Sequence, residues 1–383
     1  MEILPRTLGT RPRLACEVRA EGVVAARAED ASAVLEAVAR VPLEDGVAVP
    51  HLRTGEAGVT VASGIGNSAA NGIVGGVTGG AAGRAKLVAA VRTALEQVSQ
   101  RSHDVTLVVP DAAVRVLLLD FDELPAKASE ALPVVRFRLK KLLPFDADDA
   151  AVSYQVMASS KGMVQVLAVA MPREVLAEYE SVVREAGFEP GAVLPSTLAA
   201  LAGLAEGERP MLVVNASSEG VTTAIVKGSL LLLHRTVDLG ADARGPARGA
   251  EPPGEVAEDR PGDNSIAAIA ARLAAAGTQT PASSAGTAAA GGAEFPINEV
   301  AQAVSVAAAY FEDTLETAPA VVFAAGTLGA EALTGVLDGA QVGPVAVEEM
   351  VGPQVLGDGA SSAGSRGGVP LGWLAGVRGA LAN

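Results

Sequence analysis

Two separate stretches of this chain open with the same local pattern, short β-strands joined by a tight turn. Residues 13–28 are apolar on both sides of the turn-prone pair Glu21-Gly22, and residues 211–227 flank a second turn at 216–220. A chain of 383 residues is long enough for two or three units of about 150 residues each. We therefore expect an α/β protein of two lobes that begin alike. The strands of the second set are predicted at residues 211–215, 221–227 and 230–237.

The first lobe is expected to span residues 12–110. Its strand pair leads into a predicted helix over residues 30–41, where small apolar residues recur at helical spacing. Residues 63–83 are so rich in Gly, Ala, Ser and Asn that we expect a mobile insertion there. The other elements of this lobe are predicted as a strand at 58–62, a helix at 85–98 and a strand at 104–109.

Residues 111–190 are predicted to form a compact inserted α/β subdomain. Its last helix, residues 173–186, is well signalled, because Pro172 precedes it and Gly187 follows it. A helix within residues 191–208 is then expected to return the chain to the first lobe. The earlier elements of the insert are predicted as a strand at 114–119, a helix to about 143, and strands at 152–158 and 164–170.

The second lobe is expected to span residues 209–350 and to contain a low-complexity insertion. Residues 240–294 are dominated by Ala, Gly, Pro, Ser, Thr and acidic residues, and such a composition buries too little apolar area to offset chain entropy. We expect this insertion to be largely disordered, apart from a possible helix at 265–275. The lobe continues with a predicted helix at 298–314 and strands at 318–324 and 342–347.

Residues 351–383 are expected to form a loop and a C-terminal docking helix. Trp373, Val377 and Leu381 recur at helical spacing, which is typical of a face that packs onto a core.

Charge and composition exclude several classes of function. The formal net charge of −15 disfavours a nucleic-acid partner, because a phosphate backbone would be repelled. The single cysteine, Cys16, excludes an intramolecular disulfide and favours a reducing compartment, and three scattered histidines predict no metal cluster. The N-terminus lacks an apolar signal region, and no run of about 20 apolar residues is free of charge. We expect a cytoplasmic protein.

The sequence motifs offer little support for an enzyme. The string Ser63-Gly64-Ile65-Gly66-Asn67-Ser68-Ala69 matches G-x-G-x-x-A, but the residues after it do not predict the helix that a dinucleotide site requires. No P-loop is present, because the nearest glycine-rich string lacks the lysine and the hydroxyl residue. No G-x-S-x-G elbow occurs either. We predict no catalytic residue and no metal ligand.

The most distinctive segment lies in the predicted insert. It reads VRFRLKKLLPF at 135–145, continues as an acidic turn at 146–149, and ends in a Ser-Tyr-Gln-Val strand at 153–156. In this order the segment resembles the PilM family of type IV pilus assembly proteins. The resemblance covers residues 105–240 well and residues 299–382 more loosely.

The resemblance implies an actin-like (ribonuclease H-like) two-lobed fold with an inserted α/β subdomain in the first lobe. It also implies paired turns that hold the phosphates of ATP, with an Asp for magnesium-bound water and a Gly for close backbone approach. This chain has Glu17-Val18-Arg19 at the first turn and Asn215-Ala216-Ser217 at the second, and it keeps only Gly326 at the third. The resemblance therefore implies a degenerate nucleotide site, with ATP and Mg²⁺ bound weakly at most. The candidate residues are Glu17, Arg19, Asn215, Ser217 and Gly326.

The resemblance further implies a partner, the N-terminal tail of the inner-membrane protein PilN, held by the insert at the inner face of the inner membrane. The partner-binding candidates are Arg138, Leu142, Pro144 and Phe145, although Phe145 at a helix stop fits a core position equally well. Two alternatives remain open: an actin-like ATPase that still turns over ATP, and a cytoplasmic platform component of type II secretion. The sequence also leaves open contacts with the pilus motor ATPase and between copies of this chain.

Overall fold

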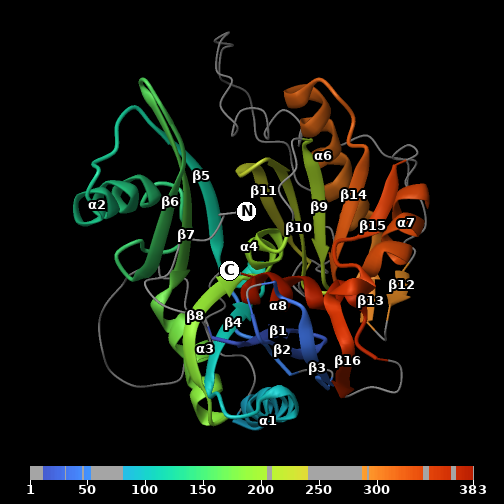
Figure 1. The fold of residues 1–383 in the computed structure, drawn as a ribbon. Helices are drawn as coiled ribbons and strands as arrows, with labels where there is room; N and C mark the ends of the chain where they lie inside the picture. The colour runs from blue at the N-terminus through green and yellow to red at the C-terminus, as the bar shows by residue number, and fades with distance from the viewer. Residues whose placement is uncertain are drawn as a thin grey trace, which may run out of the picture.

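A computed structural model describes residues 12–30, 32–44, 47–52, 81–204, 209–239, 287–290, 293–339, 345–363 and 368–382. Three sheets carry the architecture, with a six-stranded sheet in the first lobe, a five-stranded sheet in the second and a three-stranded sheet in the insert. Figure 1 shows the insert and the second lobe standing side by side above the first lobe. Among the described residues, no helix is both long enough and apolar enough to span a bilayer.

The first-lobe sheet is buried on both faces, and alternate residues of its strands serve different cores. In β1, Leu14 and Cys16 belong to the cluster formed with helix α1, whereas Ala15 belongs to the cluster formed with helix α8. This is the two-residue period expected of a strand with covered faces. The strand order is β16-β3-β2-β1-β4-β8. The strands are β1 (Leu14–Arg19), β2 (Gly22–Ala28), β3 (Leu35–Pro42), β4 (Asp104–Val109), β8 (Glu189–Pro195) and β16 (Leu356–Ala363).

The predicted strand pair at 13–28 is confirmed, but the predicted helix at 30–41 is wrong. That segment contains strand β3, which pairs with β2 in antiparallel register. Ala37 and Ala39 face the α1 cluster, while Val38 faces the α8 cluster. Val38 lies on the same face as Glu36 and Arg40, so it interrupts the alternation of apolar and polar residues that would identify a strand. The alanines of the segment, which favour helices, made a helix the expected structure.

Two helices cover the outer face of the first-lobe sheet. Helix α1 (Ala81–Val98) begins within the predicted mobile insertion, so residues 81–83 are helical, while the strand expected at 58–62 and the motif at 63–69 lie outside the described residues. Helix α3 (Arg173–Glu185) packs on α1, and its Tyr179 and Val183 share the same core. The helix thus lies in the first lobe, although the sequence assigned it to the insert.

The inserted sheet has the order β5-β7-β6 and carries one helix. Val135 and Leu139 of α2 are completely buried against Leu119, Val166 and Ala168 of the sheet. The strands occur where they were predicted, whereas the helix ends at Leu139, before the predicted position near residue 143. The elements are β5 (Arg115–Phe121), α2 (Ala128–Leu139), β6 (Ala150–Ser160) and β7 (Met163–Pro172).

The second lobe has the sheet order β11-β10-β9-β14-β15, with helices α6 and α7 packed on one face. Its first three strands and helix α6 occur where the sequence predicted them, whereas helix α7 was not expected. Hairpin β12–β13 lies at the end of the predicted disordered insertion, and residues 240–286, including the helix expected at 265–275, lie outside the described residues. The elements are β9 (Met211–Ala216), β10 (Gly220–Lys227), β11 (Leu230–Asp238), β12 (Thr287–Ala290), β13 (Ala293–Pro296), α6 (Ile297–Leu315), β14 (Val321–Gly326), α7 (Gly329–Gly339) and β15 (Ala346–Glu349).

Helix α8 (Leu374–Leu381) lies at the centre of the molecule, between the two large sheets (Figure 1). One cluster joins it to Ala15 of the first lobe and to Val213 of the second. It packs closely on α4 (Ser196–Ala202), because Gly379 presents no Cβ toward the backbone of Ala199. The predicted docking face is confirmed, since Trp373, Val377 and Leu381 are all buried.

Candidate functional site

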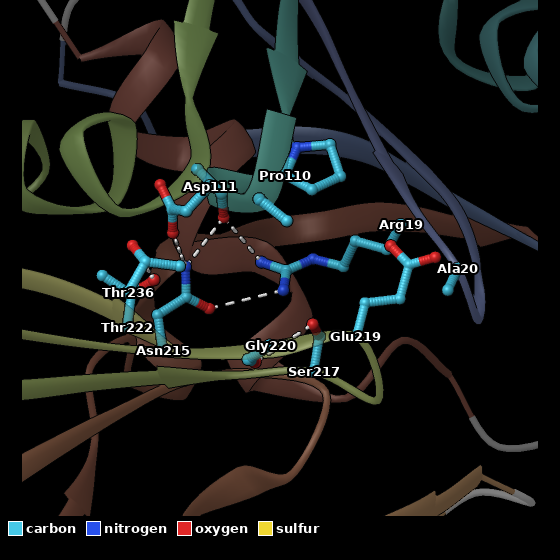
Figure 2. Close-up of a pocket in the computed structure, with 12 residues that line it drawn as sticks. Arg19, Ala20, Pro110, Asp111, Asn215, Ser217, Glu219, Gly220, Thr222 and Thr236 are labelled. Carbon is cyan, nitrogen blue, oxygen red and sulfur yellow. Dashed lines mark hydrogen bonds between the residues drawn. The ribbon is translucent and has the colours of Figure 1, made fainter. Parts of the chain in front are cut away.

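Polar side chains from both lobes meet in the centre of the molecule, beside a small hollow that opens to solvent. The end of β1 and the short helix η1 (Asp111–Ala113) contribute from the first lobe, α4 contributes at its start, and β9 contributes from the second lobe. Figure 2 shows Arg19, Asp111 and Asn215 pointing toward one another around this hollow. We call the six residues that meet here the central network: Glu17, Arg19, Asp111, Ser196, Thr197 and Asn215.

The core of the network is a buried ion pair. Arg19 Nη2 lies 2.5 Å from Glu17 Oε1, and the side chains are only 4% and 0% exposed. Ser196 donates its hydroxyl to the same Glu17 oxygen at 2.6 Å and accepts from Arg19 at 3.1 Å. Burial raises the pKa of Glu17, although Arg19 and Ser196 act in the opposite direction. An ion pair buried in this way strongly penalises the loss of either partner.

Asn215 joins the second lobe to this ion pair, and its side-chain amide both donates and accepts hydrogen bonds. Its Oδ1 accepts from Arg19 Nη1 at 3.3 Å, and its Nδ2 donates to Ser196 Oγ and to Thr197 Oγ1, each at 2.9 Å. The same Nδ2 lies 3.4 Å from Asp111 Oδ2. An aspartate here could not donate these bonds and would face the Asp111 carboxylate. The sequence therefore places an asparagine where the network needs both a donor and an acceptor.

Asp111 was not foreseen as part of the site. Its carboxylate accepts the Thr197 N–H at 3.1 Å and the Thr197 hydroxyl at 2.5 Å, so it holds the start of α4. Ser196 and Thr197 were not foreseen either. The available signals were Pro110-Asp111 directly after a predicted strand and a Ser-Thr pair at the start of a predicted helix, both of which indicate capping.

The remaining predicted residues lie at the edge of the network. Ser217 lines the hollow, and its hydroxyl donates to the Gly220 carbonyl of its own turn at 3.3 Å. Gly326 has φ of +90°, and a Cβ there would collide with the Ala216 carbonyl and lie 2.6 Å from Asn215 Oδ1. Gly326 is therefore required for the approach of the third turn to β9. All five predicted residues thus come together, three of them within the network.

The residues of this site do not fit a magnesium nucleotide. The Glu17 carboxylate is paired with Arg19, and the Asp111 carboxylate is bound to Thr197. Magnesium requires available oxygen ligands, and a guanidinium in the same hollow would repel the ion. No cluster of His, Cys, Asp and Glu suited to a metal occurs in the part of the chain that the structure describes. The arrangement is that of a charge-paired link between lobes.

The partner-binding candidates lie in the insert, and they divide into two groups. Arg138, Leu142 and Pro144 are exposed, whereas Phe145 is half-buried and packs against the core of the insert. Phe137 was not predicted as a partner-binding residue, yet it is 68% exposed and lies one turn of α2 after the exposed Val134. Which apolar residues of a short helix face solvent depends on tertiary packing, so periodicity alone did not distinguish Phe137 from Phe145.

No family model matches this chain, and no curated protein matches it either. Solved structures do. A chain of the PilM-PilN type IV pilus biogenesis complex is 17% identical, with a TM-score of 0.55 over 88% of this chain and 91% of that one.

Two further solved structures overlap more loosely. The cytoplasmic domain of EpsL, an inner membrane component of the type II secretion system of Vibrio cholerae, is 14% identical with a TM-score of 0.35 over 59% of this chain and 70% of that one. The ethanolamine utilization protein EutJ from Carboxydothermus hydrogenoformans is 10% identical with a TM-score of 0.38 over all of this chain and 91% of that one. The match to the chain of the PilM-PilN complex, which alone of these three has a TM-score above 0.5, shows that this chain has the predicted actin-like fold of two lobes and an insert.

Proposed function

We propose that this protein is a cytoplasmic scaffold of a type IV pilus inner-membrane assembly platform, and that it binds the N-terminal tail of a PilN-like membrane protein. The observation that carries the proposal is the match to the PilM-PilN complex, which extends over nearly the whole length of both chains. On this proposal the protein lies at the inner face of the inner membrane, where its partner holds it.

The central network supports a scaffold over an ATPase. A phosphoryl-transfer site needs donors and carboxylates that are available to the nucleotide and its metal. Here Arg19, Glu17 and Asp111 are engaged with one another or with α4, so these groups are not available to a nucleotide or its metal while those contacts are intact. We propose that the protein does not hydrolyse ATP and needs neither ATP nor Mg²⁺ for its role.

We propose the exposed side of α2 and the turn after it as the surface that takes an apolar anchor, because it carries Phe137, the most exposed large apolar side chain among the described residues. We call it the α2 face and define it by Val134, Phe137, Arg138, Lys141 and Leu142. Peptide tails usually bind through a few apolar anchors, while nearby charges tune orientation and rate. Phe137 and Leu142, at 68% and 49% exposed, supply that apolar area.

The basic residues around this surface are not equally available. Arg136 binds the carbonyls of Ala147 and Ala150, and Lys140 pairs with Asp148 at 2.6 Å. Arg138 and Lys141 form no ion pair with any other residue that the structure describes. We therefore propose Arg138 as the charge that orients the tail and Phe137 and Leu142 as its anchors.

Isothermal titration with a synthetic N-terminal peptide of the PilN-like protein from the same organism tests the proposal. We expect the wild-type chain to bind, and Phe137→Ser and Leu142→Ser to weaken binding about tenfold each, a loss of about 1.4 kcal/mol. Arg138→Glu should have a smaller effect that fades with added salt. Val34→Ser is the matched control, because Val34 is 40% exposed but lies in the first lobe.

Two different outcomes would contradict the proposed partner and the proposed binding surface separately. No heat of binding by the wild-type chain at about 500 µM peptide, a concentration that would reveal an affinity of about 1 mM, would rule out the partner. Unchanged affinity in folded Phe137→Ser and Leu142→Ser variants would rule out the α2 face and leave the partner standing.

A further inference from the structure

Glu21 makes a second link between the lobes, outside the central network. It lies in the turn between β1 and β2, and its carboxylate reaches two separate turns of the second lobe. Glu21 Oε1 accepts the Ser218 N–H at 2.5 Å and the Thr327 hydroxyl at 2.8 Å. These partners are 197 and 306 positions away in sequence, so one oxygen joins three distant segments.

The two turns that supply these donors are hydrogen-bonded within the second lobe by contacts that do not involve Glu21. Thr327 and Leu328 donate their N–H groups to the Ala216 carbonyl at 2.8 and 3.4 Å, and the Ser217 N–H is bound to the Gly220 carbonyl at 2.9 Å. The Thr327 hydroxyl lies 3.5 Å from the same Ala216 carbonyl, which is farther than its 2.8 Å bond to Glu21. The Ser218 N–H and the Thr327 hydroxyl are thus the donors that these two turns present to a ligand. A fixed backbone N–H beside a hydroxyl, next to glycines that allow close approach, is the chemistry that binds oxyanions.

The charges around Glu21 are mixed, with one cation and one further acid coupled to its carboxylate. The Arg40 guanidinium feels the field of Glu21, which counteracts the effect of burial on the pKa of Arg40. Glu219 is close enough that Glu21 contributes to the raised pKa of its carboxyl. The second Glu21 oxygen, Oε2, is buried without a hydrogen bond. The described hydrogen bonds that hold the carboxylate here are therefore those that Ser218 and Thr327 donate to Oε1.

We propose that Ser218 and Thr327 form an oxyanion-binding site of the second lobe, and that the chain fills this site with its own Glu21 carboxylate. Glu21 is then an intramolecular ligand that keeps the lobes closed without any bound nucleotide. This inference goes beyond the proposed function, because it does not depend on the partner. It predicts that removing the Glu21 carboxylate opens the site to a free oxyanion such as inorganic phosphate.

Thermal unfolding of the full chain in phosphate and in chloride of equal ionic strength tests the inference. We expect Glu21→Ala to lower Tm by about 3 °C in chloride, because two charge-assisted hydrogen bonds are lost. About 50 mM phosphate should restore at least half of that loss by binding the vacated site, while the wild type should shift by less than about 1 °C. Glu123→Ala, which removes an exposed acid from the insert, is the control and should not respond to phosphate.

Further variants identify the site and guard against a folding failure. Thr327→Val added to Glu21→Ala should abolish the rescue by phosphate, because it removes one of the two donors. Glu21→Gln keeps an acceptor of the same shape and should lose about half as much Tm as Glu21→Ala, so it substitutes if the alanine variant does not fold. The inference is overturned if Glu21 substitutions leave Tm unchanged, or if phosphate raises the Tm of the wild type and the variants equally.

Discussion

Arg19 Nη2 and Glu17 Oε1 lie 2.5 Å apart in the centre of the molecule, and both side chains are almost completely shielded from solvent. The pair lies on a single strand, β1, two residues apart, yet Arg19 also binds Asn215 of the second lobe. A pair of this kind makes the two lobes energetically dependent on each other, because neither charge can be left alone in the interior.

Removing only the cation should be costly. We expect Arg19→Met to lower the free energy of unfolding by about 3–5 kcal/mol, because Glu17 would remain buried without a counter-charge. The double variant Glu17→Gln/Arg19→Met should recover much of this loss, since no isolated charge remains. Urea denaturation measures both values. Arg184→Met is the control: it removes the surface ion pairs of Arg184 with Glu180 and Glu189 and should cost less than about 1 kcal/mol. Equal losses in the two single variants would contradict the prediction.

Glu219 should make the stability of the protein depend on pH near neutrality. Burial, followed by the charges of Glu21 and Asp238, raises the pKa of Glu219 to about 7, while His51 acts in the opposite direction. The folded state therefore binds this proton more tightly than the unfolded state does. The resulting stability is fully present below the ordinary pKa of 4.5 and is lost as the pH rises through about 7.

The Glu219→Gln variant tests this dependence, because it removes the titrating group. Relative to the variant, the wild-type free energy of unfolding should fall as the pH rises from about 5 to about 8. Urea denaturation at a series of pH values measures the difference. Parallel curves for the two proteins would show that Glu219 does not titrate in this range.

Magnesium-dependent release of phosphate from ATP should not exceed background. Asn215→Asp would restore a carboxylate at the second turn, but it would lie about 3.4 Å from Asp111 Oδ2 and lose the donated bonds. We expect this variant to be less stable and still inactive. A phosphate-release assay on purified protein, together with thermal unfolding, decides the point. Robust turnover that Asn215→Ala abolishes would revive the ATPase interpretation.

Two glycine-to-alanine substitutions should have opposite signs. A Cβ at Gly379 of α8 would overlap the Ala199 carbonyl oxygen, so Gly379→Ala should lower the free energy of unfolding by about 2 kcal/mol or more. Gly335 lies in α7 with no atom within 4 Å of an added Cβ. Gly335→Ala should therefore stabilise the protein by about 0.5–1 kcal/mol through helix propensity. Chemical denaturation of both variants provides the comparison, and a loss in Gly335→Ala would refute the packing argument.

The sequence predicted the individual helices and strands of this protein better than it predicted which of them pack together. The strands around Glu21 and Asn215 followed from turn residues and apolar runs, and the resemblance brought Glu17, Arg19 and Asn215 to one site. Asp111 and Ser196 were not predicted, because their contacts form only where α4 returns the chain to the first lobe. There Ser196 binds Glu17, and Thr197 binds Asp111. Such a meeting depends on long-range packing, which local periodicity does not encode.

The errors have the same physical origin. Helix α3 directly follows the insert in sequence, and for that reason it was assigned to the insert. Its apolar face instead packs on α1 of the first lobe. Strand β3 contributes Ala37 and Ala39 to one core and Val38 to the other, and Val38 interrupts the alternation of apolar and polar residues that identifies a strand. Glu21 was interpreted only as a turn residue, since its ligands are 197 and 306 positions away.

The placement of β16 and α8 in the first lobe has a consequence for how this protein folds. Leu356 of β16 is paired with Leu35 of β3, and α8 packs against β1 and β2. Contacts between such distant segments slow folding, because the intervening chain must be ordered before they can form. During synthesis, strands β1 to β3 leave the ribosome before β16 and α8 and must wait for them. The first lobe therefore completes its hydrophobic core only after the second lobe has been made.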